Sequence, residues 1–181
     1  MTKKIGFIVG SLKETSFNRM FAKHMIGQLP EGYEGSIINI ADLQMYKEDY
    51  DVNVPAEYTS FREEIDKCDG IVFFTPEYNR SFSGAVKNAL DVGSRPYGKS
   101  KWAGKPAAVF SVSMGPFGGL EANNDLKKVV SFLGMPVLPA PEVCIASAFN
   151  FIKDGEIVKD TSDFLQSATD SYVAFLDKNL K

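Results

Sequence analysis

Short apolar runs alternate along the chain with longer segments in which apolar residues recur every three or four positions. The runs predict buried strands, and the longer spacing predicts amphipathic helices. The first four expected strands cover residues 4–9, 36–40, 70–74 and 107–112. A fifth strand is expected to begin at residues 135–138, and whether it is interrupted and continues at 142–145 stays open. The expected helices cover residues 17–29, 55–68, 84–92, 120–133 and 162–180.

The alternation of strands and helices is typical of a parallel sheet with helices on both faces. We therefore expect an α/β protein, a three-layer doubly wound domain around a five-stranded parallel sheet. No linker, internal repeat or low-complexity segment interrupts the pattern, so residues 1–181 are expected to form a single domain. The Asp154-Gly155 turn signal predicts a small hairpin within residues 149–158.

Composition narrows the function classes. The net charge of −3 and the pI near 5.3 disfavour a general nucleic-acid binder, which usually presents a basic face. No apolar run approaches the roughly 20 residues that cross a bilayer, so no membrane partner is expected. The apolar run from Ile5 ends too early for a signal peptide and reads as a first buried strand, which favours a cytoplasmic protein.

The two cysteines and the single histidine argue against disulfide, metal and His-based catalytic sites. Cys68 and Cys144 are far apart and predict two buried, reduced thiols, with no disulfide framework and no zinc site. His24 is the only histidine, so a His-based triad or a two-His metal site is excluded. Its place in a helix predicts a structural role, and no metal site is expected.

Three polar loops are expected at the carboxyl ends of the first, third and fourth strands, where open parallel sheets bind ligands. In the first loop, Ser11, Lys13, Thr15 and Ser16 precede a helix N-terminus, an arrangement that suits a phosphate group. The Walker ending and the GxGxxG fingerprint are both missing. A role as turn and capping residues alone stays open for this loop.

The second loop, which begins at Thr75, indicates the kind of ligand more specifically than any other segment. Tyr78 can flank the face of a flat ring, and Asn79 with the loop backbone can bond its polar edge. In the third loop, Ser113 can hydrogen-bond a ligand, and the glycines after it allow close approach of the backbone, although a plain strand-to-helix turn would also use them. The three loops together predict one crevice.

The motifs in these loops resemble those of the NADPH-dependent FMN reductase family over nearly the whole chain. The matching residues are Gly10, Ser11, Lys13, Ser16 and Asn18, then Pro76, Glu77, Tyr78 and Asn79, and finally Ser113, Gly115, Gly118 and Gly119. Departures from the family pattern are Lys13 for Arg, Ser83 for Pro and Val92 for Trp. The resemblance implies a flavodoxin-like fold with strand order 2-1-3-4-5.

The resemblance also implies the roles of these residues toward FMN. The phosphate would be held by Ser11, Lys13, Ser16 and Asn18, with Phe17 in the same loop. Pro76, Glu77, Tyr78 and Asn79 would line the isoalloxazine ring, and Ser113, Gly115, Gly118 and Gly119 would close the other side. For Glu77, ligand contact and bracing of the loop backbone both stay open.

The implied activity is that of an NAD(P)H-dependent, FMN-containing oxidoreductase. The hydride would pass from nicotinamide C4 to flavin N5, and a flavin, quinone, azo compound or similar small acceptor would then be reduced in a ping-pong cycle. No catalytic acid or base is expected. Two alternatives are a flavodoxin-type electron carrier without nicotinamide turnover and a flavin-responsive interaction protein.

Some features have two interpretations. Family members are commonly dimers or tetramers, so a homodimer or homotetramer is expected, and Phe82, Tyr97 and Trp102 could lie at its interface or cover the core. Lys99, Lys101 and Lys105 could attract the 2′-phosphate of NADPH or belong to a solvated loop. Lys87 and Asn88 read as surface or packing residues.

Overall fold

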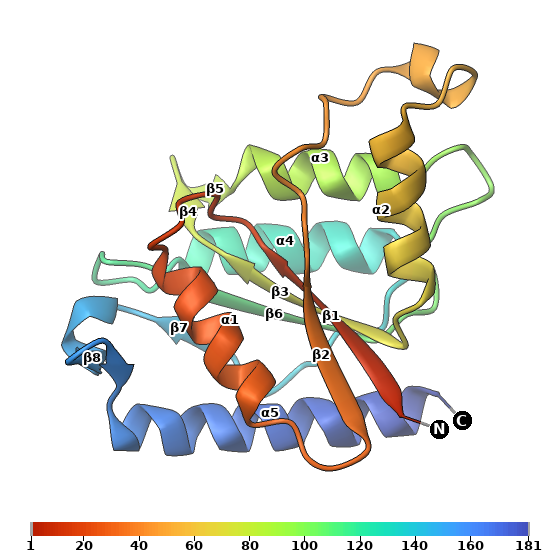
Figure 1. Cartoon of the computed structure of the whole chain (residues 1–181). Coiled ribbons are helices and arrows are strands. Elements are labelled where there is room, and N and C mark those ends of the chain that lie inside the picture. The colour runs from red at the N-terminus through yellow and green to blue at the C-terminus, as the bar shows by residue number, and fades with distance from the viewer. Residues whose placement is uncertain (1, 181) are drawn as a thin grey trace.

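A single parallel sheet lies between two layers of helices in the computed structural model, which describes residues 2–180 (Figure 1). Its strands are β1 (Lys3–Val9), β2 (Tyr33–Ile38), β3 (Gly70–Thr75), β6 (Ala107–Val112) and β7 (Val143–Ile145). Their order is β2-β1-β3-β6-β7, and all neighbours pair in parallel. This confirms the predicted α/β class, the flavodoxin-like strand order and the three layers.

Five helices cover the two faces of this sheet. One face carries α1 (Phe17–Gly27) and α5 (Lys159–Asn179), and the other carries α2 (Ala56–Asp66), α3 (Gly84–Gly93) and α4 (Leu120–Phe132) (Figure 1). Ser16 and Ser83 cap the N-termini of α1 and α3 with their side chains.

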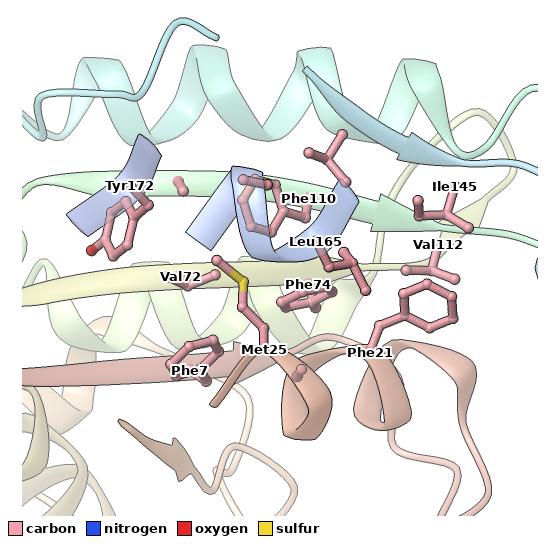
Figure 2. Packing of buried hydrophobic residues seen from close by; sticks show 14 of the residues in the cluster. Phe7, Phe21, Met25, Val72, Phe74, Phe110, Val112, Ile145, Leu165 and Tyr172 are labelled. Carbon is pink, nitrogen blue, oxygen red and sulfur yellow. The ribbon is translucent and has the colours of Figure 1, made fainter. Parts of the chain in front are cut away.

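Alternate strand residues build a separate core on each face, because successive side chains point to opposite sides of a sheet. Figure 2 shows the core beneath α1 and α5, where Phe7, Phe74 and Phe110 come from neighbouring strands. The centroids of the Phe74 and Phe110 rings lie 5.3 Å apart. Both β3 and β6 are buried along their whole length, which explains their unbroken apolar sequence.

The opposite core contains the only tryptophan. Trp102 is fully buried, packs against Phe61 and Phe73, and donates its indole N–H to the Leu90 carbonyl at 2.9 Å. Of the two roles left open for this residue, the structure therefore supports the core. Tyr97 is 92% exposed, and Phe82 is half-buried.

Several boundaries differ from the predicted ones. β2 runs over Tyr33–Ile38 and not 36–40, because it pairs with β1 from Lys3 opposite Tyr33 onward. α1 ends at Gly27, and α5 begins at Lys159. The fifth strand is the short β7, preceded by one isolated bridge from Val137 to Ala107. Two prolines, Pro139 and Pro141, lie between them and cannot donate to a ladder.

Shorter elements lie in the connections. The predicted hairpin is present as β8 (Ile152–Lys153) and β9 (Glu156–Ile157), after the 3₁₀ turn η2 (Ala148–Phe151). The connection after β2 contains a second 3₁₀ turn, η1 (Glu48–Asp51). A hairpin of β4 (Glu77–Tyr78) and β5 (Ser81–Phe82) occupies the second loop and was not predicted.

The cysteines and the histidine occupy structural places. Cys68 is buried and Cys144 is half-buried, so the prediction of two buried thiols is confirmed for Cys68 and only partly met by Cys144. Both thiols are free, and burial raises the pKa of each. His24 Nε2 lies 2.8 Å from Ser162 Oγ, a contact that joins α1 to α5. Among residues 2–180, no helix is long and apolar enough to cross a membrane.

Candidate functional site

The three predicted loops meet at one edge of the sheet and enclose a cavity of 480 Å³. This volume falls within the range of roughly 300–1,000 Å³ found for small-molecule sites. The residues that line it come from all three loops: Ser11, Lys13, Thr15, Ser16, Phe17, Asn18, Pro76, Glu77, Tyr78, Val112, Ser113 and Met114.

The first loop presents unpaired donors at the start of α1. Ser16 caps this helix, since its Oγ accepts from the Arg19 N–H at 3.2 Å and its carbonyl accepts from the Met20 N–H at 3.0 Å. The N–H groups of Phe17 and Asn18 have no acceptor within the helix itself. With the exposed Lys13 nearby, these donors suit an anion such as a phosphate.

Asn18 joins this loop to the end of β6. Its Nδ2 donates to the Val112 carbonyl at 3.0 Å, and the residue is only 4% exposed. Its Oδ1 is buried and has no hydrogen-bond partner among the described residues. A buried acceptor of this kind needs a donor, and a hydroxyl of a ribityl chain would supply one. The polar groups present therefore fit FMN.

The first and second loops touch at Gly10. A Cβ atom on this glycine would lie 2.8 Å from Ser83 Oγ and 3.1 Å from Pro76 Cδ. Any larger residue would push the two loops apart, so this close approach explains glycine at position 10.

The second loop forms a hairpin with a two-residue turn. Asn79 and Arg80 have φ values of 52° and 66°, as a turn with two left-handed central residues requires. Tyr78 precedes the turn, lines the cavity and is 53% exposed, so its ring is available to a ligand.

Two side chains fix this hairpin to α4. Glu77 Oε2 accepts from the N–H groups of Glu121 and Ala122 at 3.1 and 3.3 Å, which are in the first turn of α4. Ser81 Oγ donates to Asp125 Oδ2 at 2.8 Å. Of the two roles left open for Glu77, bracing is therefore present in the structure, although the side chain also lines the cavity.

The third loop uses its glycines for a turn. Gly118 and Gly119 have φ values of 63° and 78°, and Gly119 is the N-cap of α4. A Cβ atom on Gly118 would lie 2.5 Å from the Cys144 carbonyl oxygen. Ser113 Oγ accepts from the Gly115 N–H at 3.0 Å, which shapes the start of the loop.

The predicted site residues divide into two groups. Nine line the cavity: Ser11, Lys13, Ser16, Phe17, Asn18, Pro76, Glu77, Tyr78 and Ser113. Four are outside its lining: Asn79, Gly115, Gly118 and Gly119. Three further residues line the cavity: Thr15, which was predicted as part of the phosphate-type loop but given no contact to FMN, and Val112 and Met114, which were not predicted. Thr15 and Met114 stand within the predicted loops, but an apolar residue such as Val112 carries no chemical signal.

Three lysines considered for the 2′-phosphate of NADPH follow α3, at the opposite edge of the sheet from the cavity. Lys101 pairs with Asp66 at 2.6 Å, Lys105 donates to the Cys68 carbonyl, and Lys99 is exposed. Asn88 is a packing residue, because its amide bonds the backbone of Leu43, Gln44 and Tyr46. Within residues 2–180, no group of three His, Cys, Asp or Glu side chains could hold a metal ion.

Known proteins resemble this chain over nearly its whole length. The family model for NADPH-dependent FMN reductase matches residues 3–150. A quinone reductase of Pseudomonas putida is 41% identical over 97% of this chain and 95% of its own length. A 2-hydroxy-1,4-benzoquinone reductase of a Burkholderia species is 38% identical over 97% of both proteins.

A solved structure is similar over almost the entire chain. It is the flavoenzyme NAD(P)H:(acceptor) oxidoreductase FerB from Paracoccus denitrificans, 33% identical, with a TM-score of 0.91 over 98% of this chain and 99% of that one. Residues, geometry and relatives agree with the resemblance predicted from the loop motifs. The chain belongs to the NADPH-dependent FMN reductase family.

Proposed function

We propose that this chain is an NAD(P)H-dependent, FMN-containing oxidoreductase that reduces a quinone or a similar small oxidant. The observation that carries the proposal is the cavity itself, which has a phosphate-type loop on one side and the Tyr78 hairpin on another. The quinone reductases among the relatives support the acceptor class.

The nine predicted residues that line the cavity are proposed to hold FMN. Ser11, Lys13, Ser16 and the first N–H groups of α1, which include that of Asn18, would bind its phosphate. The side-chain Oδ1 of Asn18 would in addition accept from a hydroxyl of its ribityl chain. Pro76, Glu77, Tyr78 and Ser113 would surround the ring, with Asn79 and the glycines 115, 118 and 119 supporting the loops. When bound, FMN supplies the hydride and electron chemistry.

The chain's own contribution is then position and electrostatics. The ionisable side chains in the lining are Lys13, Glu77 and Tyr78, and the Glu77 carboxylate already accepts two N–H groups of α4. No lining residue is therefore proposed as a general acid or base. Fixing the hairpin to α4 holds the ring-binding surface in place for hydride transfer, which needs reacting atoms near ~3–3.5 Å.

Anaerobic titration of the FMN-reconstituted protein with NADPH and NADH tests the proposal. Either donor should bleach the flavin absorbance, and a quinone added afterwards should restore it. Flavin that binds without being bleached would favour the flavodoxin-type carrier. Failure to bind FMN would overturn the proposed FMN site.

A pair of lysine variants tests the phosphate loop separately. Lys13→Ala should weaken FMN binding, whereas Lys67→Ala, which removes an exposed lysine at the end of α2, should not.

We further propose that the protein is a cytoplasmic, single-domain homodimer or homotetramer, joined through α3 and α4. A 680 Å³ groove lies between these helices and is lined in part by Tyr46, Val129 and Leu133. Phe132 also lines it and is 88% exposed, an unusual state for so large an apolar side chain. Sedimentation should show Phe132→Glu shifted toward monomer, and an unshifted distribution would contradict this interface.

A further inference from the structure

Arg80 is a free cation beside the cavity. It follows Tyr78 and Asn79 at the tip of the hairpin and is exposed. None of the ion pairs in the described part of the chain includes it, so its charge is not neutralised by a neighbouring carboxylate. An unpaired guanidinium next to a ligand-sized cavity is available for an anion.

The side chain of Arg80 is oriented by an aromatic ring of the third loop. Its Cζ lies 5.6 Å from the centroid of Phe117, which is itself 63% exposed. The contact joins the second loop to the third outside the cavity lining, and each partner follows a lining residue closely: Arg80 comes two residues after Tyr78, and Phe117 three residues after Met114. The position is consequently defined and still open to solvent.

The backbone at this position favours glycine over arginine. Arg80 has a φ of 66°, in the left-handed region, where a residue with a Cβ is strained. Turns of this type usually place Gly second. A long cationic side chain kept in a strained conformation at the rim of a site indicates a functional role for that side chain.

The proposed donor creates a need for such a cation. A nicotinamide dinucleotide carries a pyrophosphate, and among residues 2–180 Lys13 is the only cationic side chain that lines the cavity. Lys13 belongs to the loop assigned to the FMN phosphate, and Lys101 and Lys105 are engaged at the opposite edge of the sheet. We propose that Arg80 binds a phosphate group of the nicotinamide dinucleotide donor, an inference that rests on the proposed function.

Equilibrium binding of the oxidised nucleotides NADP⁺ and NAD⁺ to the FMN-loaded protein tests this role. The variants are Arg80→Gly, which suits the turn, and Arg80→Lys, which keeps the charge without the planar fork; Lys67→Ala is the control. Arg80→Gly should weaken binding roughly three- to tenfold, as for one exposed charge-assisted contact, with Arg80→Lys in between. Because glycine suits the turn, the melting temperature of Arg80→Gly should not fall below that of the parent protein, and its FMN affinity should be unchanged.

The pattern across the two nucleotides identifies the phosphate. Equal weakening for both assigns Arg80 to the pyrophosphate, and weakening for NADP⁺ alone assigns it to the 2′-phosphate. In both cases the rate of flavin bleaching at saturating donor should be unchanged, since the contact lies away from the reacting atoms. Unchanged binding of both nucleotides by folded Arg80→Gly would overturn the role of Arg80 alone. A parent protein that binds FMN but neither nucleotide would overturn the proposed function as well.

Discussion

The hydroxyl of Tyr172 shows how one buried polar atom can tie a helix to the sheet. This side chain of α5 is completely buried in the core that Figure 2 shows. Its hydroxyl donates to the Pro106 carbonyl at 3.0 Å, just before β6. The same carbonyl accepts from the Ile71 N–H at 2.9 Å. Burial raises the pKa of Tyr172 well above its ordinary range, so the neutral phenol belongs to the folded state.

Tyr172→Phe should lower the free energy of unfolding by about 0.5–1.5 kcal/mol at pH 7, the net value of one hydrogen bond. The pH dependence of the unfolding free energy distinguishes the two proteins more sharply. Because the folded pKa lies above the unfolded value of about 10, the phenol stabilises the folded state fully below pH ~10, and this stabilisation is lost as the pH rises further. Urea denaturation at pH 7 and above pH 10 should show a smaller alkaline loss for the variant.

Other tyrosines do not obscure that comparison. Burial also raises the pKa values of Tyr33, Tyr46 and Tyr58, but these residues are present in both proteins. The difference between the two pH profiles therefore isolates Tyr172. Equal alkaline losses in the parent and the variant would mean that the buried phenol does not couple protonation to folding.

Two glycines in α3 offer a matched test of packing within one helix. A Cβ atom on Gly93 would lie 2.5 Å from two ring atoms of Trp102, which is fixed by burial and by its bond to Leu90. Gly93→Ala should therefore cost about 1–3 kcal/mol of stability through overpacking. Gly84→Ala meets nothing within 4 Å and should stabilise by about 0.4–1 kcal/mol. Denaturant midpoints that shift in the same direction would contradict this account.

The link between β4 and α4 makes Glu77 important for both stability and binding. Glu77→Ala removes the acceptor of two N–H groups in the first turn of α4, a loss of about 0.5–2 kcal/mol by analogy with N-caps. Glu77→Gln retains an acceptor oxygen and should lose less. FMN titration should show weaker binding in the same order. Glu63→Ala, at an exposed position of α2, serves as the control.

The elements that could be predicted from sequence were those with a strong burial pattern. β3 and β6 are buried on both faces and were visible as apolar runs. The β4–β5 hairpin was not predicted, because its turn is Asn79-Arg80 and lacks the glycine that normally signals one. The length of β7 depends on its pairing with β6, which the local sequence does not encode.

The same limits apply to the candidate site. Ser16 and Tyr78 stood in motifs with a recognisable chemistry, whereas Val112 and Met114 line the cavity only because the strand and loop place them there. For Gly118 and Gly119, ligand approach and a strand-to-helix turn were both left open, and their positive φ values show that they serve the turn into α4. A glycine alone cannot distinguish these two uses.

Cofactor binding should stabilise the whole protein, because loops as distant in the chain as Ser11 and Ser113 form the cavity only in the folded state, so FMN would bind that state alone. FMN at about 100 times its Kd should raise the free energy of unfolding by about 2.7 kcal/mol. Riboflavin lacks the phosphate and should stabilise less at equal concentration, and Lys13→Ala should narrow the gap between the two ligands. Thermal melts with each ligand measure this. Equal stabilisation by both would contradict the phosphate role of the first loop.

Trp102 gives this protein an internal optical probe of only one of its two cores. The indole lies fully buried on the α2–α3 side of the sheet, and the chain has no second tryptophan to dilute its emission. Flavin fluorescence, in contrast, would depend on loops that connect to both helical layers. If the two helical layers unfold together, the tryptophan and flavin signals will change at the same denaturant concentration. If the layers unfold separately, the tryptophan signal will change at a different concentration from the flavin signal.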